Sequence, residues 1–410
     1  MLPEPVSRLS AEVIIVGGGV AGVTAAAVLA QQGRRVILLD SRSAYPPVFK
    51  AEKVEQDELR VLREFGLLEP LLPHSGRSSE VYVASGDRIF RRKPMEQIGI
   101  PYADLVNILR ANLPAGVETR LGQADRIIPG AGKTSVRLTT GEELTARLVV
   151  LACGISDPLL SSLGLWRRVI QKEQCVGLGF DVATSDSRPF PFQSLTYYPT
   201  NAAYGIDYLT LFKIRHTMRA NLFIFRPADD PWIRAFHSEP ELLLQHAMPK
   251  LSRVIGEYQV MGSVVSSRVD LYRTEGRMPD GVVLIGDALQ TACPSTGLGI
   301  KKVLTDVNVL AECAPQWFST PGMSVEKING FYDHQRKRSV DAHALQRALY
   351  QRRAATSQSL RWRVYRALLH LRRSLSPSIK LSPSLQPRKF GAAPIPTLES
   401  QARGSSLGAD

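Results

Sequence analysis

The sequence has few cysteines and histidines, and none of them forms a recognisable site. Its four cysteines, at positions 153, 175, 293 and 313, are far apart, with no C-x-x-C pair and no histidine at ligand spacing. This pattern excludes a zinc ribbon and a disulfide framework, so we expect no metal site. The seven histidines are scattered, and none has a serine or cysteine in a local signature of nucleophilic catalysis.

An apolar run is missing from the first ten residues, which predicts no secretory signal. Together with the cysteine usage, this favours a cytoplasmic protein, with peripheral membrane attachment as a further option. The 410 residues are 44% hydrophobic and 22% charged, which is ordinary for globular chains and excludes collagen-like, disordered and multi-span membrane classes. The length predicts two or three structural units.

Acidic residues are scarce only towards the C-terminus. The formal net charge is +13, but residues 331–410 hold 15 basic and 4 acidic residues and carry +11 of it. Residues 1–330 are therefore nearly neutral, at +2. Because no recognition module accompanies the basic tail, we expect no nucleic-acid partner.

The N-terminal segment predicts a βαβ unit. Residues 13–16 and 36–39 read as buried parallel strands, and residues 21–32 read as the helix between them. Gly17, Gly19 and Gly22 form a G-x-G-x-x-G motif at the first strand-to-helix turn. They permit the tight turn, the close approach of a pyrophosphate and close helix-to-strand packing. Asp40 ends the second strand, where its carboxylate suits ribose hydroxyls, so the unit predicts dinucleotide binding.

A second segment with the pattern of a polar-ligand site lies at residues 280–312. Residues 281–285 read as a buried strand that ends at Gly286 and Asp287. A Pro294-x-x-Gly297-x-Gly299 loop follows and leads into a helix over about 300–312. An acid at a strand end and a glycine loop before a helix N-terminus suit a polar ligand. Two such constructions far apart in the chain suggest one long cofactor held at both ends.

The two blocks together resemble those of the FAD-dependent aromatic hydroxylases, the para-hydroxybenzoate hydroxylase class that includes the hydroxylases of ubiquinone biosynthesis. The resemblance covers about residues 11–345 and implies FAD as the cofactor. It implies that Gly17, Gly19 and Gly22 hold the pyrophosphate and Asp40 the adenosine ribose. It further implies that Asp287, after Gly286, holds the ribityl or pyrophosphate region. Pro294, Gly297, Leu298 and Gly299 would pass beside the isoalloxazine ring.

Some residues depart from that family's pattern. Where the family has Asp-Gly followed by Ser and Arg, this chain has Cys153-Gly154 and lacks the acid and the arginine. The resemblance implies NADH or NADPH as the reductant, and it associates this segment with both flavin and nicotinamide handling. The altered segment therefore favours reduction through a partner reductase over direct use of NADH or NADPH. Gln290 replaces a histidine and Lys301 replaces an asparagine. We expect Lys301 to point to solvent rather than to favour an anionic flavin.

The fold class follows as α/β. It comprises a Rossmann-like FAD-binding domain with a mixed, mainly parallel sheet, an inserted antiparallel-sheet substrate domain, and a C-terminal helical segment. The FAD-binding domain is expected over residues 11–80, 100–175 and 269–345, and the substrate domain over 81–99 and 176–268. Alternation at 208–212 and 221–225 predicts strands that form one wall of a pocket.

No catalytic side chain is assigned from the sequence. Tyr102, Tyr204, Tyr208 and His216 are candidates, and for each a structural role is the better expectation. Cys293 precedes Pro294 and is expected to be a small buried hydrophobe rather than a site residue.

Residues 346–375 predict one basic amphipathic helix, followed by a disordered tail over 376–410. Leu360, Val364, Leu368, Leu371 and Leu375 share one face of this helix, and Trp362, Tyr365 and Leu369 form a second strip. The apolar face either attaches to an anionic membrane or packs on the FAD-binding domain with the arginines in solvent.

The resemblance implies a monooxygenase that inserts one atom of O₂ into an aromatic or polyene-like small molecule through a flavin peroxide adduct. Two related flavoenzyme activities remain as alternatives. A halogenase is disfavoured because the W-x-W-x-I-P signature is absent, and a prenyl-chain reductase would consume no oxygen. A flavin-binding adaptor without turnover is a third hypothesis.

Overall fold

The computed structural model describes residues 10–156, 158–201 and 205–379. Its first layer is sheet A, five parallel strands in the order β16-β10-β1-β2-β6. These strands are β1 (Val13–Val16), β2 (Val36–Asp40), β6 (Val117–Leu121), β10 (Leu148–Leu151) and β16 (Val282–Leu284). Strands β1, β2, β10 and β16 have a near-continuous apolar sequence, which is typical of strands buried on both faces, whereas β6 is a partly exposed edge strand. The predicted Rossmann-like layer is therefore confirmed.

Alternate residues of sheet A face two different cores. Val13 and Ile15 point towards the helices on one face, α1 (Val20–Gln31) and α8 (Gly299–Ser319), while Ile14 and Val16 point the other way. The second face is covered by α4 (Pro158–Ser162) and a small antiparallel sheet. That sheet comprises β7 (Ala124–Ile128), β8 (Thr134–Leu138) and β9 (Glu143–Ala146). The first core also includes α2 (Gln56–Glu64), the 3₁₀ helix η1 (Glu69–His74), α3 (Tyr102–Ala111) and α9 (Val325–Asp333).

Sheet B has eight strands in the order β15-β11-β14-β13-β12-β4-β5-β3. All its pairs are antiparallel except β4 with β12. The strands are β3 (Ala51–Glu55), β4 (Gly76–Ser85), β5 (Arg88–Pro101), β11 (Trp166–Thr184), β12 (Ser194–Tyr198), β13 (Ile206–Ile214), β14 (Thr217–Ile224) and β15 (Tyr258–Glu275). One face packs on α5 (Pro231–Ser238), α6 (Pro240–Ala247) and α7 (Leu251–Ile255).

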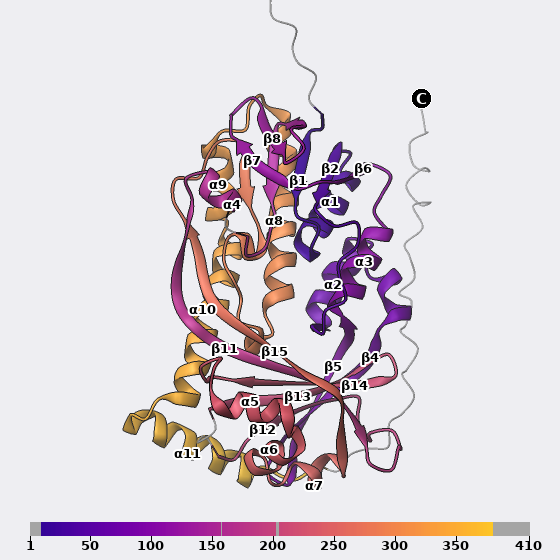
Figure 1. Ribbon diagram of the computed structural model, residues 1–410, viewed down its shortest axis with the longest axis vertical. Coiled ribbons are helices and arrows are strands. Elements are labelled where there is room, and N and C mark those ends of the chain that lie inside the picture. The colour runs from indigo at the N-terminus through magenta and orange to yellow at the C-terminus, as the bar shows by residue number, and fades with distance from the viewer. Residues whose placement is uncertain (1–9, 157, 202–204, 380–410) are drawn as a thin grey trace, which may run out of the picture.

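The two sheets are joined by long continuous strands. Strands β11 and β15 pair along most of their length and run between the part of the molecule around sheet A and the part around sheet B (Figure 1). The expected domain boundaries after residues 80, 175 and 268 fall inside β4, β11 and β15. The division of the chain into domains therefore stays a prediction.

The C-terminal helical segment differs from the expectation. The single helix expected over 346–375 is wrong, because the structure has two helices, α10 (Gln335–Thr356) and α11 (Leu360–Leu375). Ser357 and Ser359 have extended backbone at the break, where hydroxyl groups compete for backbone hydrogen bonds. Helix α10 packs along α8, β11 and β13 beside the two sheets (Figure 1).

The end of α11 is fixed to sheet B. Arg88 donates to the carbonyl oxygens of Ser374 and Ser376, and the Arg373 guanidinium lies 4.0 Å from the centre of the Tyr198 ring. The Ile379 amide donates to the Ile89 carbonyl over 2.7 Å. Residues 376–379 of the expected disordered tail are thus placed against sheet B, and residues 380–410 lie outside the described part of the chain.

Candidate flavin site

A cavity of about 1940 Å³ lies between sheet A, sheet B and α10. This is about twice the upper end of the usual range for small-molecule pockets, ~1,000 Å³. The residues predicted from the two sequence blocks gather on its wall: Gly17, Gly19, Asp40, Asp287, Pro294, Gly297, Leu298 and Gly299. Gly22 and Gly286 are not on the wall. Segments nearly 270 residues apart in the chain therefore face one space.

Gly17 and Gly22 are required by close backbone packing. Gly17 has φ +107°, and a Cβ there would lie 2.5 Å from the Ala152 carbonyl oxygen. A Cβ on Gly22 would lie 1.8 Å from the carbonyl oxygen of Gly17. Gly19 differs, because its Cβ would meet only the Tyr102 hydroxyl, at 3.5 Å. The side of Gly19 that faces the cavity is therefore open to a ligand.

Two helices present uncapped N-termini to the cavity. Helix α1 begins after Gly19 and α8 begins after Leu298, and neither N-cap residue accepts a hydrogen bond with a side chain. The free N–H groups and the positive end of each helix dipole favour anionic or electron-rich groups. A Cβ on Gly297 or Gly299 would meet nothing within 4 Å. The residues present therefore fit an extended anionic cofactor such as FAD.

Asp40 is held by backbone and guanidinium groups. Its Oδ2 accepts from the Gly18 amide over 2.5 Å and from Arg110 Nη2 over 3.0 Å, and its Oδ1 accepts from the Arg42 amide over 2.8 Å. Arg110 also donates twice to the Gly18 carbonyl, over 2.9 and 2.7 Å. Arg110 thus fixes the glycine turn. The sequence reasoning missed it because nothing local to α3 marks this contact.

Asp287 opens onto the cavity, and protein atoms surround it on its other sides. This burial raises the pKa of its carboxyl group, while Lys302 and Lys50 oppose the rise. Lys50 lines the cavity, pairs with Glu52 at 2.8 Å and lies 4.2 Å from the centre of the Tyr102 ring. Burial lowers the pKa of Lys50, but Glu52, Tyr102 and Asp287 outweigh it and raise the pKa overall. Lys50 was also missed by the sequence reasoning.

The altered Cys153-Gly154 turn lies on the cavity wall beside Asp287. Arg167, on β11, joins these two turns by donating to the carbonyl oxygens of Gly154 over 2.8 Å and Asp287 over 3.0 Å. Gln290 is buried and donates to the backbone carbonyl of Asp341 over 3.1 Å, which connects it to α10. Lys301 is partly exposed and pairs with Asp57 at 3.2 Å at the rim.

An aromatic wall closes the cavity on the side of sheet B. Tyr208 lies 5.9 Å from Tyr198 and 5.1 Å from Phe223, measured between ring centres, and all three line the cavity. The Tyr208 hydroxyl donates to the Ser295 carbonyl over 2.7 Å, and burial raises the pKa of Tyr208. Gly177 and Gly179 of β11 form a flat part of the same wall.

Only some of the other candidate residues line the cavity. Tyr102 lines the cavity, whereas His216 is exposed in the β13–β14 turn away from it. Tyr204 lies outside the described residues. Cys293 is fully buried, with its Sγ 3.1 Å from Ser295 Oγ, and does not line the cavity. Asp207, which the sequence did not single out, has a buried Oδ2 that has no hydrogen-bond partner among the described residues. Burial raises its pKa to about 7, against the opposing charges of Arg347 and Arg373.

The family comparison matches most of the chain. The family described as FAD binding domain matches residues 10–313. The chain belongs to the FAD-dependent monooxygenases of this family. It is therefore an oxidoreductase, and FAD is its cofactor. The squalene epoxidase family also matches residues 264–372.

The curated relatives include monooxygenases of two kinds. The chain is 28% identical over 345 residues to kynurenine 3-monooxygenase of Salinispora tropica, covering 75% of this chain and 73% of the relative. It is 24% identical over 380 residues to squalene monooxygenase of Rattus norvegicus, covering 85% of this chain and 63% of the relative. The chain is also similar to a reductase. It is 22% identical over 369 residues to digeranylgeranylglycerophospholipid reductase of Methanosarcina acetivorans, covering 82% of this chain and 83% of the relative.

Solved structures share the fold of this flavoprotein. The p-nitrophenol 4-monooxygenase of Pseudomonas putida superposes with a TM-score of 0.69 at 17% identity, covering 88% of this chain and 92% of that one. A halogenase superposes with a TM-score of 0.65 at 16% identity, covering 84% and 76%. At these identities the likeness shows the fold alone.

Proposed function

We propose that this flavoprotein hydroxylates or epoxidises an apolar aromatic or polyene-like small molecule. One observation carries the proposal: the predicted flavin loops and the aromatic wall of sheet B line a single cavity. A substrate held on Tyr198, Tyr208 and Phe223 would lie on the side of the cavity that faces the Pro294–Gly299 loop. The relatives named for kynurenine and squalene are consistent with an aromatic or a polyene substrate.

The proposed cofactor contacts follow the geometry of the two blocks. The turn of Gly17, Gly19 and Gly22 and the N-terminus of α1 would hold the pyrophosphate, and Asp40 the adenosine ribose. Asp287, aimed by the Gly286 turn, would hold the ribityl or pyrophosphate region. Pro294, Gly297, Leu298 and Gly299 would lie against the isoalloxazine ring. When bound, FAD supplies the oxygen activation.

The protein's own task is to orient the substrate and exclude water. The aromatic side chains and the two glycines of β11 give a broad apolar surface that would hold a flat or extended substrate. Polar groups on the same wall, Thr196, Thr210 and Asn221, are available to orient a substrate oxygen or nitrogen. No protein nucleophile is needed for this chemistry.

The function is tested by reducing the FAD-loaded protein anaerobically with light and EDTA and then measuring oxygen uptake and product with kynurenine, p-nitrophenol and squalene. The proposal expects at least one of them to give a product that carries one added oxygen. A product that gains halogen and requires halide would assign a halogenase. A product that gains two hydrogens without oxygen uptake would assign a reductase. A reduced flavin that gives no product with any of the three would favour the adaptor.

The electrons are proposed to come from NADH or NADPH through a partner reductase. This rests on the Cys153-Gly154 turn, which lacks the acid and arginine of the family's pattern and lies on the cavity wall. Flavin bleaching is followed with NADH or NADPH alone and then with an added NADPH-dependent flavodoxin reductase. Rapid bleaching without the reductase would contradict the partner, and no bleaching in either case would contradict the nicotinamide source.

A second proposal concerns α11, which would attach to an anionic membrane surface. Leu360, Val364, Leu368, Leu371 and Leu375 are 48–75% exposed and form one face of the helix. This exposure among the described residues supports attachment to a membrane over packing of this face on the FAD-binding domain. Arg361, Arg363 and Arg372 are exposed beside this face, and each would contribute about 1 kcal/mol near anionic lipid. No described helix is long and apolar enough to cross a membrane.

Co-sedimentation with vesicles tests this attachment. The full chain is compared with L368E/L371E on vesicles of phosphatidylcholine with and without phosphatidylserine. The double variant is expected to lose binding to the anionic vesicles. L121E, at a leucine that is 68% exposed on β6, is the matched control and should bind as the wild type does. Equal binding by L368E/L371E would contradict the attachment.

A further inference from the structure

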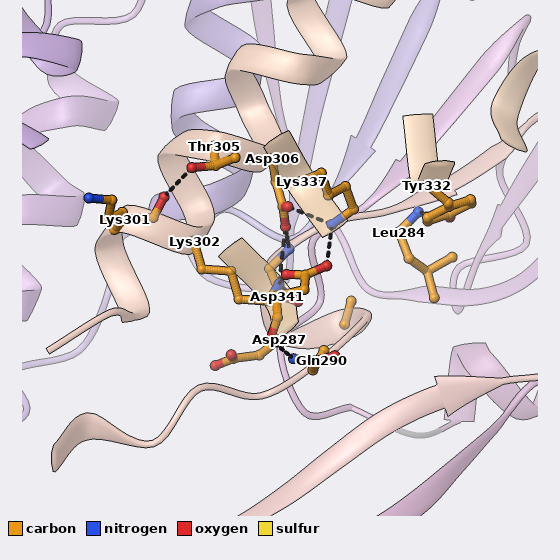
Figure 2. Close-up of polar contacts among 12 residues, drawn as sticks. Leu284, Asp287, Gln290, Lys301, Lys302, Thr305, Asp306, Tyr332, Lys337 and Asp341 are labelled. Carbon is orange, nitrogen blue, oxygen red and sulfur yellow. Dashed lines mark hydrogen bonds and ion pairs between the residues drawn. The ribbon is translucent and has the colours of Figure 1, made fainter. Parts of the chain in front are cut away.

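Three buried charged side chains and a partly buried one lie directly behind the Gly286–Asp287 turn (Figure 2). Lys302 and Asp306 come from α8, and Lys337 and Asp341 come from α10. Lys302 Nζ lies 3.2 Å from Asp306 Oδ2 and 3.4 Å from Asp341 Oδ1. Lys337 Nζ lies 2.6 Å from Asp306 Oδ1 and 3.1 Å from Asp341 Oδ2. This ion cluster has two positive and two negative members, and three of them are 1% exposed.

Two members of the ion cluster hold the Gly286 peptide groups from both sides. The Gly286 amide donates to Asp306 Oδ2 over 2.8 Å, and Lys302 Nζ donates to the Gly286 carbonyl over 3.2 Å. Gly286 has φ +59°, and a Cβ there would lie 3.2 Å from the Ala21 Cβ of α1. The orientation of this residue is therefore fixed, and the next residue is Asp287, which opens onto the cavity.

The charges depend on one another. Burial disfavours the charged form of Lys302, but Asp306, Asp341 and Asp287 outweigh it and raise its pKa. Burial likewise opposes ionisation of Asp306, but Lys302 and Lys337 outweigh it and lower its pKa. Removing a single member would leave an unpaired buried charge, which is strongly destabilising. The ion cluster therefore acts as one unit.

A buried ion cluster is weak evidence for stability, because well-packed apolar side chains often replace one at no cost. The hydrogen bonds of this ion cluster indicate a role other than stability. Among the described residues, the four side chains of the ion cluster make two hydrogen bonds to groups outside the cluster, and both are with the Gly286 backbone. The ion cluster therefore constrains the residue before Asp287 more than it constrains any other part of the chain.

We propose that the ion cluster of Lys302, Asp306, Lys337 and Asp341 is a positioning site that fixes Gly286 and so aims the Asp287 carboxylate at FAD. This rests on the proposed role of Asp287 in cofactor binding. The ion cluster also joins α8 to α10, which carries His343, Arg347 and Gln351 on the cavity wall. Lys302 is thus a positioning residue rather than a catalytic one.

The test measures the Kd of FAD for the apoprotein by fluorescence titration, together with the apoprotein's melting temperature. K302M is expected to lower the melting temperature and to raise the Kd roughly tenfold, since a hydrogen bond from a charged group is lost. K302M/D341L removes one charge of each sign and leaves the Asp306–Lys337 pair. It should recover the melting temperature but keep the raised Kd, because the Gly286 carbonyl still lacks its donor.

Lys327 supplies the matched control. Its Nζ donates to four carbonyl oxygens in the last turn of α8 and just after it, of residues 317, 320, 321 and 322, remote from the cavity. K327M should lower the melting temperature and leave the Kd for FAD unchanged. This comparison separates a loss of stability from a loss of cofactor positioning.

A wild-type Kd in K302M/D341L would overturn the proposal and leave the ion cluster a structural element. If both Lys302 variants fail to fold, D341N decides, because Asp341 is the most exposed member at 16%. D341N must raise the Kd, and an unchanged Kd would overturn the proposal. Failure of the wild-type apoprotein to bind FAD would instead contradict the assigned cofactor contacts, so the two failures are distinguishable.

Discussion

The Tyr208 hydroxyl donates a hydrogen bond to the Ser295 carbonyl oxygen over 2.7 Å and so joins sheet B to the glycine loop at the cavity. The same carbonyl accepts from Gln351 of α10 over 3.2 Å. One backbone oxygen thus connects the aromatic wall, the predicted flavin loop and the helix that closes the cavity. The position of the substrate wall relative to the flavin loop depends on this contact.

We expect Y208F to uncouple the reaction more than it destabilises the protein. Loss of one buried hydrogen bond should lower the free energy of unfolding by about 1 kcal/mol. It should also loosen the wall, so that less product forms per O₂ consumed and more hydrogen peroxide appears. Urea unfolding and the ratio of product to peroxide measure the two effects.

Tyr197 supplies the control for this variant. Its hydroxyl donates to the Gly86 carbonyl over 2.8 Å, and it does not line the cavity. Y197F should show a similar loss of stability with unchanged coupling. If Y197F and Y208F uncouple equally, the Tyr208 contact has no special role.

The glycine turn offers a contrast between two substitutions. G22A places a Cβ 1.8 Å from the Gly17 carbonyl oxygen, so it should destabilise the apoprotein itself. In G19A the nearest atom is the Tyr102 hydroxyl at 3.5 Å, an ordinary contact, and the Gly19 backbone is extended. G19A should therefore keep the apoprotein's melting temperature and weaken FAD binding by blocking the pyrophosphate. A normal Kd for FAD in G19A would argue against that contact.

The raised pKa of Asp207 predicts how the free energy of unfolding depends on pH. Burial raises its pKa from 3.8 to about 7 in the folded protein, so the folded state holds the proton more tightly than the unfolded state does. Its stabilising contribution is complete below about pH 4 and is lost as the pH rises towards 7. The loss is up to about 4 kcal/mol, since each pKa unit corresponds to about 1.4 kcal/mol.

D207N should remove that dependence, because an amide does not ionise. The variant should be more stable than the wild type at pH 8 and show a flatter profile between pH 4 and 7. Urea unfolding across this range measures both curves. Parallel profiles for the two proteins would show that Asp207 is not the titrating group.

The sequence predicted the two ends of the cofactor region because their signals are local. The turn at Gly17 and the strand end at Asp287 are each marked by neighbouring residues, and the structure brings both to one cavity. The contacts of Arg110 with Gly18 and of Arg167 with Asp287 have no local signal, since the two residues of each pair lie 92 and 120 residues apart in the chain. Such contacts arise only from the tertiary fold.

The substrate wall and the C-terminal helices were harder to predict for different reasons. Alternation around Tyr208 predicted a strand but could not decide which face lines the cavity. The break between α10 and α11 depends on Ser357 and Ser359, in a segment whose composition suits one continuous helix. The apolar face of α11 was found correctly, but its exposure could only come from the structure.

Isotope labelling tests the central claim most directly. The FAD-loaded protein is reduced anaerobically and mixed with ¹⁸O₂ and kynurenine, p-nitrophenol or squalene. The masses of the products are then measured by mass spectrometry. A monooxygenase that holds its substrate on the sheet B wall predicts one ¹⁸O atom per product molecule for at least one substrate. If the flavin is completely reoxidised, all the O₂ consumed appears as hydrogen peroxide and no substrate gives a labelled product, the claim is contradicted.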